Sequence, residues 1–554
     1  MKLLSISVVA LFCSLTVSVK AAPSFPYDYP VEKPFIVPDI QYGTGTAPEI
    51  LLPPAEDLVP KELGVDVYVT QFKFIGNTIF SNAELLAVIS EYINKKITTN
   101  ELHTIRNKLT QFYIDHGYIN SGAILPDQEI DKGIITYSIT EGVLSVVQLS
   151  GQKNLHHDYI YNRVLLGVEA PLNVNAVQKQ LFLLQQDLRI KRVNAKLKPG
   201  LSAGESFLYL EVEEDKLYRA NINVNNHSSP SVGSERIDID YEHLSLFGYG
   251  DTLNLGFGKT EGLDDFNFQY SLPITASGSS IGLYYRNSDS EVVETPFSIL
   301  DVISHSETVG ISSVFSVYKD LDGQLDLGLN FEKRKSATYL LGQPYSFDTG
   351  PHDGVSRVSV LRFSQSWYKR VPNRVIAGRS TFNQGVDVMD ATINDSAPDG
   401  KFQTWLGQLQ WLERYSSNQS ELVMHANIQL ADDALLPLEQ FAIGGANSVR
   451  GYRENQLVGD SGVNYSIEYR YPLYQANDNY WQAAIFSDYG RVWNKDRSIS
   501  EPNDIYSAGI GLRWTNNKGA GFNLYWGESL RDVVSKNNDL QDDGVHFQFY
   551  IEAF

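Results

Sequence analysis

From residue 217 to residue 554, apolar and polar residues alternate in one short segment after another, and this pattern constrains the fold more than any other feature of the sequence. The clearest runs place apolar residues at Phe266, Phe268, Tyr270 and Leu272, at Val463, Tyr465, Ile467, Tyr469 and Tyr471, and at Tyr506, Ala508, Ile510, Leu512 and Trp514. Successive side chains of a β-strand point to opposite faces, so each run predicts a strand with one apolar and one polar face. No segment of this region has a convincing helical period, and the region is predicted to be all-β.

Residues 216–554 contain about 16 such strands, an even number of the kind that single-chain bacterial outer-membrane barrels have. They begin near residues 217, 236, 251, 264, 280, 306, 322, 355, 373, 402, 420, 462, 480, 505, 520 and 545. Short turns at 247–250, 319–322, 371–373, 416–418 and 516–519 mostly alternate with longer connections, with the short connection at Gly262 as an exception, and the longest connection is 431–461. Short periplasmic turns and longer surface loops are typical of these barrels. The region is therefore predicted to be an antiparallel transmembrane β-barrel.

A large soluble β-sandwich or propeller would also show alternation. It would not account for the many aromatic residues, 32 Tyr and 26 Phe, or for the aromatic last residue, Phe554. The apolar residues of the last strand are Val545, Phe547, Phe549 and Ile551. Because Phe554 has the opposite parity, either the strand has a bulge near its end or Phe554 lies off its apolar face.

The N-terminus predicts export. Lys2 precedes an apolar run at 3–17 that leads to Val19-Lys20-Ala21, the pattern of a signal-peptidase site, so residues 1–21 are predicted to be a signal peptide. A retained anchor is the weaker alternative, because the run is shorter than the roughly 20 residues that a spanning helix needs. The only cysteine, Cys13, lies inside this segment, so the exported chain is expected to have no disulfide. Residues 22–64 contain nine of the 22 prolines and are predicted to be an extended linker.

Residues 65–215 repeat one order of elements: strand, helix, helix, strand, strand. In residues 65–142, a strand at 67–74 precedes helices capped by Ser81 and Thr99 and strands at 119–125 and 133–140. In residues 143–215, the corresponding elements are predicted at 143–149, 157–166, 174–188, 193–198 and 207–213. Apolar residues at helical spacing after Ser or Thr caps support the helices. The chain is predicted to carry two tandem α+β modules in front of the barrel.

These modules resemble the polypeptide-transport-associated (POTRA) module, by their element order and by Phe74-Ile75-Gly76-Asn77 and Leu197-Lys198-Pro199-Gly200. In the barrel region, the loop sequence Val449-Arg450-Gly451-Tyr452 and the strand sequence Phe486-Ser487-Asp488-Tyr489-Gly490 are similar to those of two-partner secretion transporters. These form the TpsB family, which includes the haemolysin secretion/activation proteins, within the outer-membrane assembly-factor superfamily. The resemblance covers essentially the whole exported chain.

The resemblance implies an outer-membrane transporter that binds an unfolded partner exoprotein in the periplasm through its POTRA modules and passes it through the barrel to the cell surface. It implies a large secreted exoprotein as partner, for instance an adhesin or a cytolysin, together with outer-membrane lipids and, as a further candidate, periplasmic chaperones. Two alternatives stay open. One is a barrel-assembly insertase of the same superfamily, whose members usually carry more than two POTRA modules. The other is a passive porin or receptor, which needs no such modules.

Parity places three residues of the strand motif, Phe486, Asp488 and Gly490, on the face that points into the barrel. A carboxylate in the lumen requires a cationic partner, and Arg450 on the long loop can supply one through two parallel hydrogen bonds. Gly490 would leave room for the loop to approach. Glu468 and Arg470 on the neighbouring strand also point inward and are rival partners, so we expect either a single bridge or a network. The contact is expected to act in gating, with pure bracing of the barrel as the alternative.

Several other functions are disfavoured. A net charge of −21 and a pI near 4.9 argue against nucleic-acid binding, which needs a basic face. Gly459-Asp460-Ser461-Gly462 resembles a serine-protease motif, but the sequence lacks the supporting context, and the segment is predicted to be a turn into a strand. The pair His156-His157 is expected to lie at a helix start and not at a metal. We find no catalytic constellation, so no enzymatic activity, cofactor or metal is expected.

Overall fold

The computed structural model describes residues 66–476, 478–495, 502–533 and 538–553, and the backbone of Ile50–Leu51. The predicted signal peptide, most of the predicted linker and Phe554 lie outside these residues. The chain forms two compact units. The described part of the first is residues 217–246 and 251–553, and the described part of the second is residues 50–51, 66–216 and 247–250.

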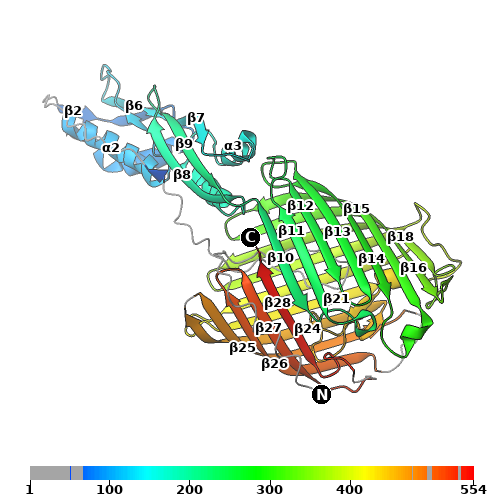
Figure 1. Ribbon diagram of the computed structural model, residues 1–554. Helices are drawn as coiled ribbons and strands as arrows, with labels where there is room; N and C mark the ends of the chain where they lie inside the picture. Colours follow the sequence, from blue (N-terminus) through cyan, green and yellow to red (C-terminus); the bar gives the residue numbers. More distant parts are fainter. Residues whose placement is uncertain (1–49, 52–65, 477, 496–501, 534–537, 554) are drawn as a thin grey trace. The chain divides into compact units, whose positions relative to one another are not determined.

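The first unit is a closed antiparallel barrel whose strands follow one another in chain order until β28 pairs with β10 (Figure 1). Sixteen strands form the wall, and the two-residue β17 (Gln343–Pro344) only extends a hairpin at the end of β16. They are β10 (Tyr218–Asn225), β11 (Arg236–His243), β12 (Thr252–Lys259), β13 (Leu263–Pro273), β14 (Ser280–Glu291), β15 (Val302–Lys319), β16 (Gly323–Leu340), β18 (Val355–Val371), β19 (Arg374–Val386), β20 (Gln403–Arg414), β21 (Glu421–Ala431), β24 (Ser461–Ala476), β25 (Asn479–Trp493), β26 (Asp504–Asn516), β27 (Ala520–Ser529) and β28 (Val545–Glu552). The predicted fold and strand count are confirmed, and the largest error in a predicted start is at β15, which begins at Val302 instead of near residue 306.

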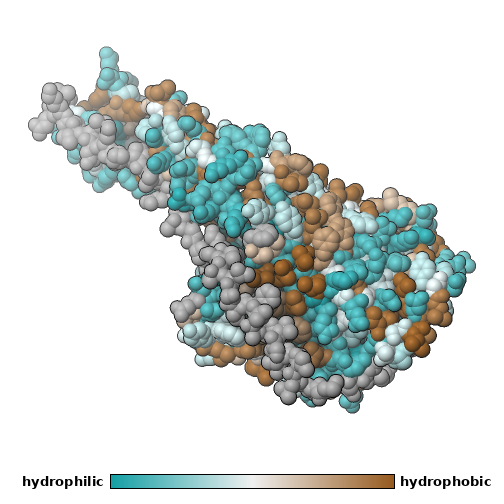
Figure 2. Space-filling model, viewed as in Figure 1, coloured by the Kyte–Doolittle hydropathy of each residue, from teal (hydrophilic) through white to brown (hydrophobic). Residues whose placement is uncertain are grey.

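The alternating pattern separates the two faces of the wall. Large apolar side chains are exposed on the outer face, and Figure 2 shows brown apolar residues over this part of the barrel. On β11 to β15 they include Ile237, Ile239, Phe257, Ile281, Leu283, Val309 and Ile311.

The pairing of β27 with β28 runs from Val545 to Ile551 without a register shift, so this stretch contains no bulge.

The second unit contains the two α+β modules. The first has β3 (Gln71–Ile75), β6 (Ile134–Thr140) and β5 (Gly122–Ile124) in one sheet, with α1 (Asn82–Val88), the short η2 (Ser90–Tyr92) and α2 (Thr99–Asp115). The second has the sheet β1-β8-β9-β7, formed by β1 (Ile50–Leu51), β8 (Ile190–Pro199), β9 (Glu205–Glu214) and β7 (Val143–Ser150), with α3 (His157–Leu165) and α4 (Val174–Gln185). Each module has its own core of buried apolar side chains, one around Leu85 and Ile105 and the other around Ile160 and Leu181.

Four details of the modules differ from the sequence prediction. The first predicted strand is divided into β2 (Asp66–Val69) and β3, and an unpredicted strand, β4 (Lys95–Thr98), pairs with β2. The second helix is capped by Thr98, not Thr99, because the Thr98 side chain accepts from the Glu101 N–H and the Glu101 side chain accepts in return from the Thr98 N–H. Part of the predicted linker also pairs, since β1 lies parallel to β8. Among the described residues, none of the helices has the length and apolarity that a membrane crossing demands.

One acidic residue at the end of a strand holds the turn before a helix in each module. Glu141 accepts hydrogen bonds from the N–H groups of Thr78 and Ile79, and Glu214 accepts them from the N–H groups of residues 153–155. Burial alone would raise the pKa of Glu214, but the hydrogen bonds from residues 153–155 outweigh it and lower the pKa. Glu214 therefore has a structural role in the second module.

Candidate functional site

The long connection between β21 and β24, residues 432–460, packs against the inward-facing side chains of the barrel wall, and we call it the lumenal loop. It contains the single turn η5 (Pro437–Glu439) and the strands β22 (Phe441–Ile443) and β23 (Leu457–Gly459), which pair with each other. Its buried apolar residues fall into two clusters with wall residues: Leu435 and Leu436 with Val358, Val360 and Phe402, and Phe441, Ile443, Val449 and Tyr452 with Leu406, Val492 and Ile505. The loop is therefore a folded part of the barrel interior.

Arg450 joins this loop to two wall strands, β24 and β25. Its Nε donates to Asp488 Oδ2 at 2.8 Å and its Nη2 donates to Asp488 Oδ1 at 2.9 Å, while its own backbone N–H donates to Asp488 Oδ2 at 3.0 Å. The same guanidinium pairs with Glu468 through Nη1 and donates to Ser466 Oγ at 3.0 Å. The structure thus brings together Arg450 and Asp488 and adds Glu468 as a second carboxylate.

Glu468 links this contact to the rest of the lumen. Arg470 Nε donates to Glu468 Oε1 at 2.6 Å, and the Tyr525 hydroxyl donates to the same oxygen at 2.9 Å. The side chains of Asp488 and Glu468 are 0% and 4% exposed, so these charges are stable only because they are paired. Of the two arrangements that the sequence left open, the structure contains the network.

The other residues of the two motifs position the loop. Val449 is fully buried, the Gly451 N–H donates to His546 Nε2 at 3.0 Å, and the Tyr452 hydroxyl donates to the backbone oxygen of Tyr506 at 2.9 Å. In the strand motif, the Phe486 ring lies 3.6 Å from the Arg450 guanidinium carbon, as in a cation–π contact. These contacts orient Arg450 from several sides.

Gly490 provides space for the loop. A Cβ atom at this position would lie 2.9 Å from Ile443 Cδ1 and 2.9 Å from Val449 Cγ2. Both neighbours belong to the lumenal loop, and any side chain at this position would overlap with them. Parity alone indicated that Gly490 faces inward, but not which loop residues it accommodates.

Sequence reasoning did not single out Ser466, Tyr525 and His546 as partners of the site. All three lie on wall strands at positions with the inward parity, which was the only available signal.

Residues 459–462 form the predicted turn into a strand: β23 ends at Gly459, β24 begins at Ser461, and between them Asp460 accepts from the N–H groups of Leu435 and Lys495. His156 caps α3 by accepting from the Asp158 N–H. Within the described part of the chain, no group of three or more His, Cys, Asp or Glu side chains is arranged to hold a metal ion.

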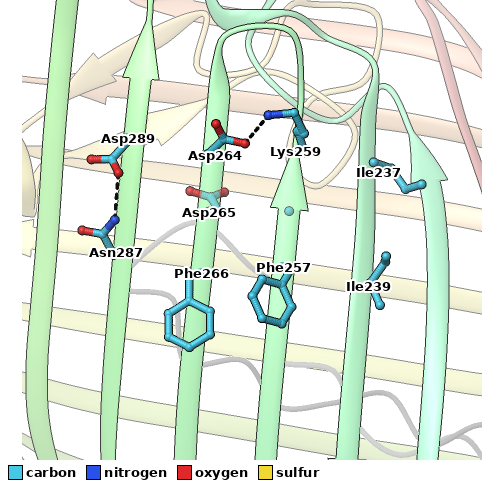
Figure 3. Close-up of a pocket in the computed structure, with 10 residues that line it drawn as sticks. Ile237, Ile239, Phe257, Lys259, Asp264, Asp265, Phe266, Asn287 and Asp289 are labelled. Atoms are coloured by element: carbon cyan, nitrogen blue, oxygen red, sulfur yellow. Dashed lines mark hydrogen bonds and ion pairs between the residues drawn. The ribbon is translucent and has the colours of Figure 1, made fainter.

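The outer wall has a shallow pocket across β11 to β14 (Figure 3). Ile239, Phe257 and Phe266 form its apolar part, and a Lys259–Asp264 ion pair of 2.5 Å lies beside it. Most of its lining residues have the outward parity of their strands, and none of them belongs to the Arg450 network. The pocket is thus a feature of the exposed wall, separate from the lumenal site.

Comparison with known proteins identifies the family. The sequence model described as "Haemolysin secretion/activation protein ShlB/FhaC/HecB" matches residues 204–514, more than half of the chain, and "POTRA domain, ShlB-type" matches residues 67–142. The chain belongs to the haemolysin secretion/activation protein family. It is therefore an outer-membrane transporter of the two-partner secretion type, with the barrel in the outer membrane and POTRA modules in the periplasm, as the resemblance predicted.

Relatives of this haemolysin secretion/activation protein agree with that assignment. The heme/hemopexin transporter protein HuxB of Haemophilus influenzae (strain ATCC 51907 / DSM 11121 / KW20 / Rd) is 21% identical over 430 residues, which cover 74% of this chain and 72% of HuxB. The outer membrane transporter CdiB of Dickeya dadantii (strain 3937) is 21% identical over 465 residues, 80% of each chain. The solved structure of CdiB from Escherichia coli has the same fold, with a TM-score of 0.65 at 18% identity over 90% of this chain and 93% of CdiB.

Proposed function

We propose that the POTRA modules hold an unfolded partner exoprotein in the periplasm and that the barrel passes it to the surface while the lumenal loop moves within the lumen. The observation that carries this proposal is the Arg450 network. A loop that lies along the inner wall is held there by two apolar clusters and, in place of a continuous strand ladder, by buried ion pairs. Such pairs can exchange partners when another charged chain enters, whereas a packed core does not.

The partner is proposed to be a large exported protein, since the related HuxB and CdiB are named transporters. Periplasmic chaperones would keep it unfolded, and outer-membrane lipids would contact the apolar outer wall. No enzymatic activity and no cofactor are proposed. The buried charges around Arg450 are paired with one another, as in a structural network.

The test is secretion of the cognate exoprotein by cells that carry Arg450→Ala or Asp488→Arg. We expect export to fall strongly at unchanged barrel levels, because either change removes the contact that positions the lumenal loop. Full secretion by both variants would refute the role of the contact in gating and leave it as a brace.

The insertase and porin alternatives predict different outcomes. Depletion of an insertase would reduce the total amount of other outer-membrane barrels, whereas depletion of this transporter should reduce only its exoprotein. Deletion of residues 65–215 should leave the flux of small solutes intact in a porin but abolish export here. These two measurements separate the three functions.

A further inference from the structure

A second cluster of buried charges fixes the first half of the lumenal loop. Glu439, the last residue of η5, accepts a hydrogen bond from Arg334 Nη1 at Oε1 (2.7 Å). Arg362 Nη2 donates to both carboxylate oxygens of Glu439, at 2.9 and 3.0 Å. Arg362 also donates from Nε to Glu332 Oε1 at 2.6 Å, and the Tyr284 hydroxyl donates to Glu332 Oε2 at 2.7 Å. The Glu439 carboxylate therefore joins the lumenal loop to a cluster of charged side chains on the wall.

The cluster is balanced and almost closed to solvent. The side chains of Glu439 and Glu332 are 1% and 5% exposed, and those of Arg362 and Arg334 are 10% and 12% exposed. Two carboxylates face two guanidinium groups, so removal of Glu439 would leave two buried cations with one anion. A buried charge that loses its partner is strongly destabilising. The wall at this point requires Glu439.

The Glu439 cluster lies on a different part of the wall from the Arg450 network. Its partners are on β16 and β18, whereas those of Arg450 are on β24 and β25, and β19, β20 and β21 lie between them in the barrel order. The apolar contacts divide in the same way, since Leu435 and Leu436 pack beside the first cluster and Val449 and Tyr452 beside the second. The two halves of the loop are thus attached to different parts of the wall, and the pairing of β22 with β23 joins them to each other.

We propose that Glu439, with Arg334 and Arg362, forms a second lock of the lumenal loop. It acts independently of Arg450 and Asp488, and the lumen opens fully only when both locks are broken. Release of Arg450 alone would leave the half of the loop around Glu439 on the wall. The inference rests on the proposed function only for the claim that the loop moves during export.

The test uses single cysteines in the full-length protein in intact cells. The only natural cysteine, Cys13, lies in the predicted signal peptide, so Ala434→Cys and Val449→Cys would report the two halves of the loop separately. Both positions are buried, with 4% and 0% exposure. A membrane-impermeant maleimide is added to cells that carry either reporter together with Glu439→Gln, Arg450→Gln, both changes or neither.

We expect Glu439→Gln to raise the labelling rate at residue 434 on the order of tenfold, as for a shift of about 1.4 kcal/mol in local opening, and to leave residue 449 unchanged. Arg450→Gln should do the reverse, and the pore conductance of the double variant in planar bilayers should exceed that of either single variant. Glu413→Gln is the matched control, because this carboxylate on β20 pairs with Arg374 on β19 and accepts from Trp411, and neither partner belongs to the lumenal loop.

Unchanged labelling at residue 434 in the Glu439→Gln protein, or an equal rise at both reporters, would overturn the second lock. A double variant that conducts no better than Arg450→Gln alone would overturn the claim that both locks must break. If Glu439→Gln fails to assemble, Arg334→Gln removes only one of the two cationic partners and is held to the same outcomes. If the proposed function is wrong instead, the labelling pattern will be as expected but the double variant will export the exoprotein normally.

Discussion

At the scale of single residues, Arg450 contacts the wall in a way that lysine could not reproduce. Its planar guanidinium binds both oxygens of Asp488, pairs with Glu468 and lies over the Phe486 ring. A lysine ammonium is a compact charge that cannot make the two parallel bonds and the ring contact together. The contact thus fixes the orientation of the loop as well as its distance from the wall.

Gly490→Val should displace the lumenal loop without changing any charge. The new side chain would occupy the space of Ile443 and Val449, which already lie at 2.9 Å from a hypothetical Cβ. We expect residues 432–460 to become susceptible to protease added to intact cells, whereas the wild-type loop resists it.

Gly407→Val is the control for this change. Gly407 lies on β20, where an added Cβ would meet the side chains of Trp405 and Ile428 and no residue of the loop. Equal protease resistance of the Gly490→Val and wild-type proteins would show that the loop adjusts to the added volume.

Contacts between single residues also differ in how well the sequence predicts them. Parity placed Asp488, Glu468 and Arg470 inside the barrel because a strand has a period of two. It could not identify Glu439 as a partner of Arg362, since the pattern gives the face of a strand residue but not the path of a loop that meets it. The pairing of Arg450 with Asp488 was predictable because a carboxylate in the lumen needs a cationic partner and the longest loop carries Arg450.

At the scale of elements, the two modules share one solution for the turn before a helix. Gly76 and Gly151 both have φ near +90°, and Glu141 and Glu214 then accept hydrogen bonds from the backbone that follows each glycine. A glycine adopts this conformation at no steric cost. The sequence repeat is therefore also a repeat of hydrogen bonding.

Acidification should loosen the turn of the second module. The pKa of Glu214 is lowered below 4.5 in the folded chain, so its stabilising contribution is fully present above about pH 4.5 and is lost as the pH falls through the folded pKa. Glu214→Ala should mimic the acid state at neutral pH and speed amide hydrogen exchange at residues 153–155 by roughly tenfold or more, since hydrogen bonds to a charged group contribute about 1.5–3 kcal/mol.

The comparison variant is Glu211→Ala, on the same strand. Glu211 is exposed and accepts a 3.4 Å hydrogen bond from the Asn194 side chain, so its loss should not change exchange at residues 153–155. Equal exchange in both variants would contradict the role of Glu214.

The elements that the sequence missed are short. The strand β4 has only four residues, Lys95–Thr98, and two of them are lysines, so no apolar alternation marks it. This strand forms because it pairs with the edge of β2, and the local sequence does not show such a tertiary contact. Longer strands such as β25, with 15 residues, carry enough alternation to be predicted from local pattern alone.

At the scale of the whole molecule, the barrel is closed by a short seam. Among the described residues, five pairs join β10 to β28, from Asn221 with Glu552 to Asn225 with Gln548, whereas β15 and β16 pair along most of their 18 residues. Fewer ladder hydrogen bonds make this the place where the wall is easiest to open.

A disulfide across the seam should nevertheless leave export intact, because the proposed route is the lumen. Val224 and Phe549 are direct partners, and the double variant Val224→Cys/Phe549→Cys would lock β10 to β28 when oxidised. The measurement is exoprotein secretion with and without reductant. Ile311→Cys/Phe331→Cys is the matched pair within β15 and β16. Loss of secretion only in the oxidised seam variant would mean that the wall must part during transport.

The two attachment points also set the length of chain that is needed between them. Glu439 and Arg450 are 11 positions apart (450 − 439), and each end is fixed to its own part of the wall. The chain between them must span the distance that separates these two parts of the wall. A deletion inside this span would shorten the chain between two fixed points, so it is expected to detach either Glu439 or Arg450 from its partners.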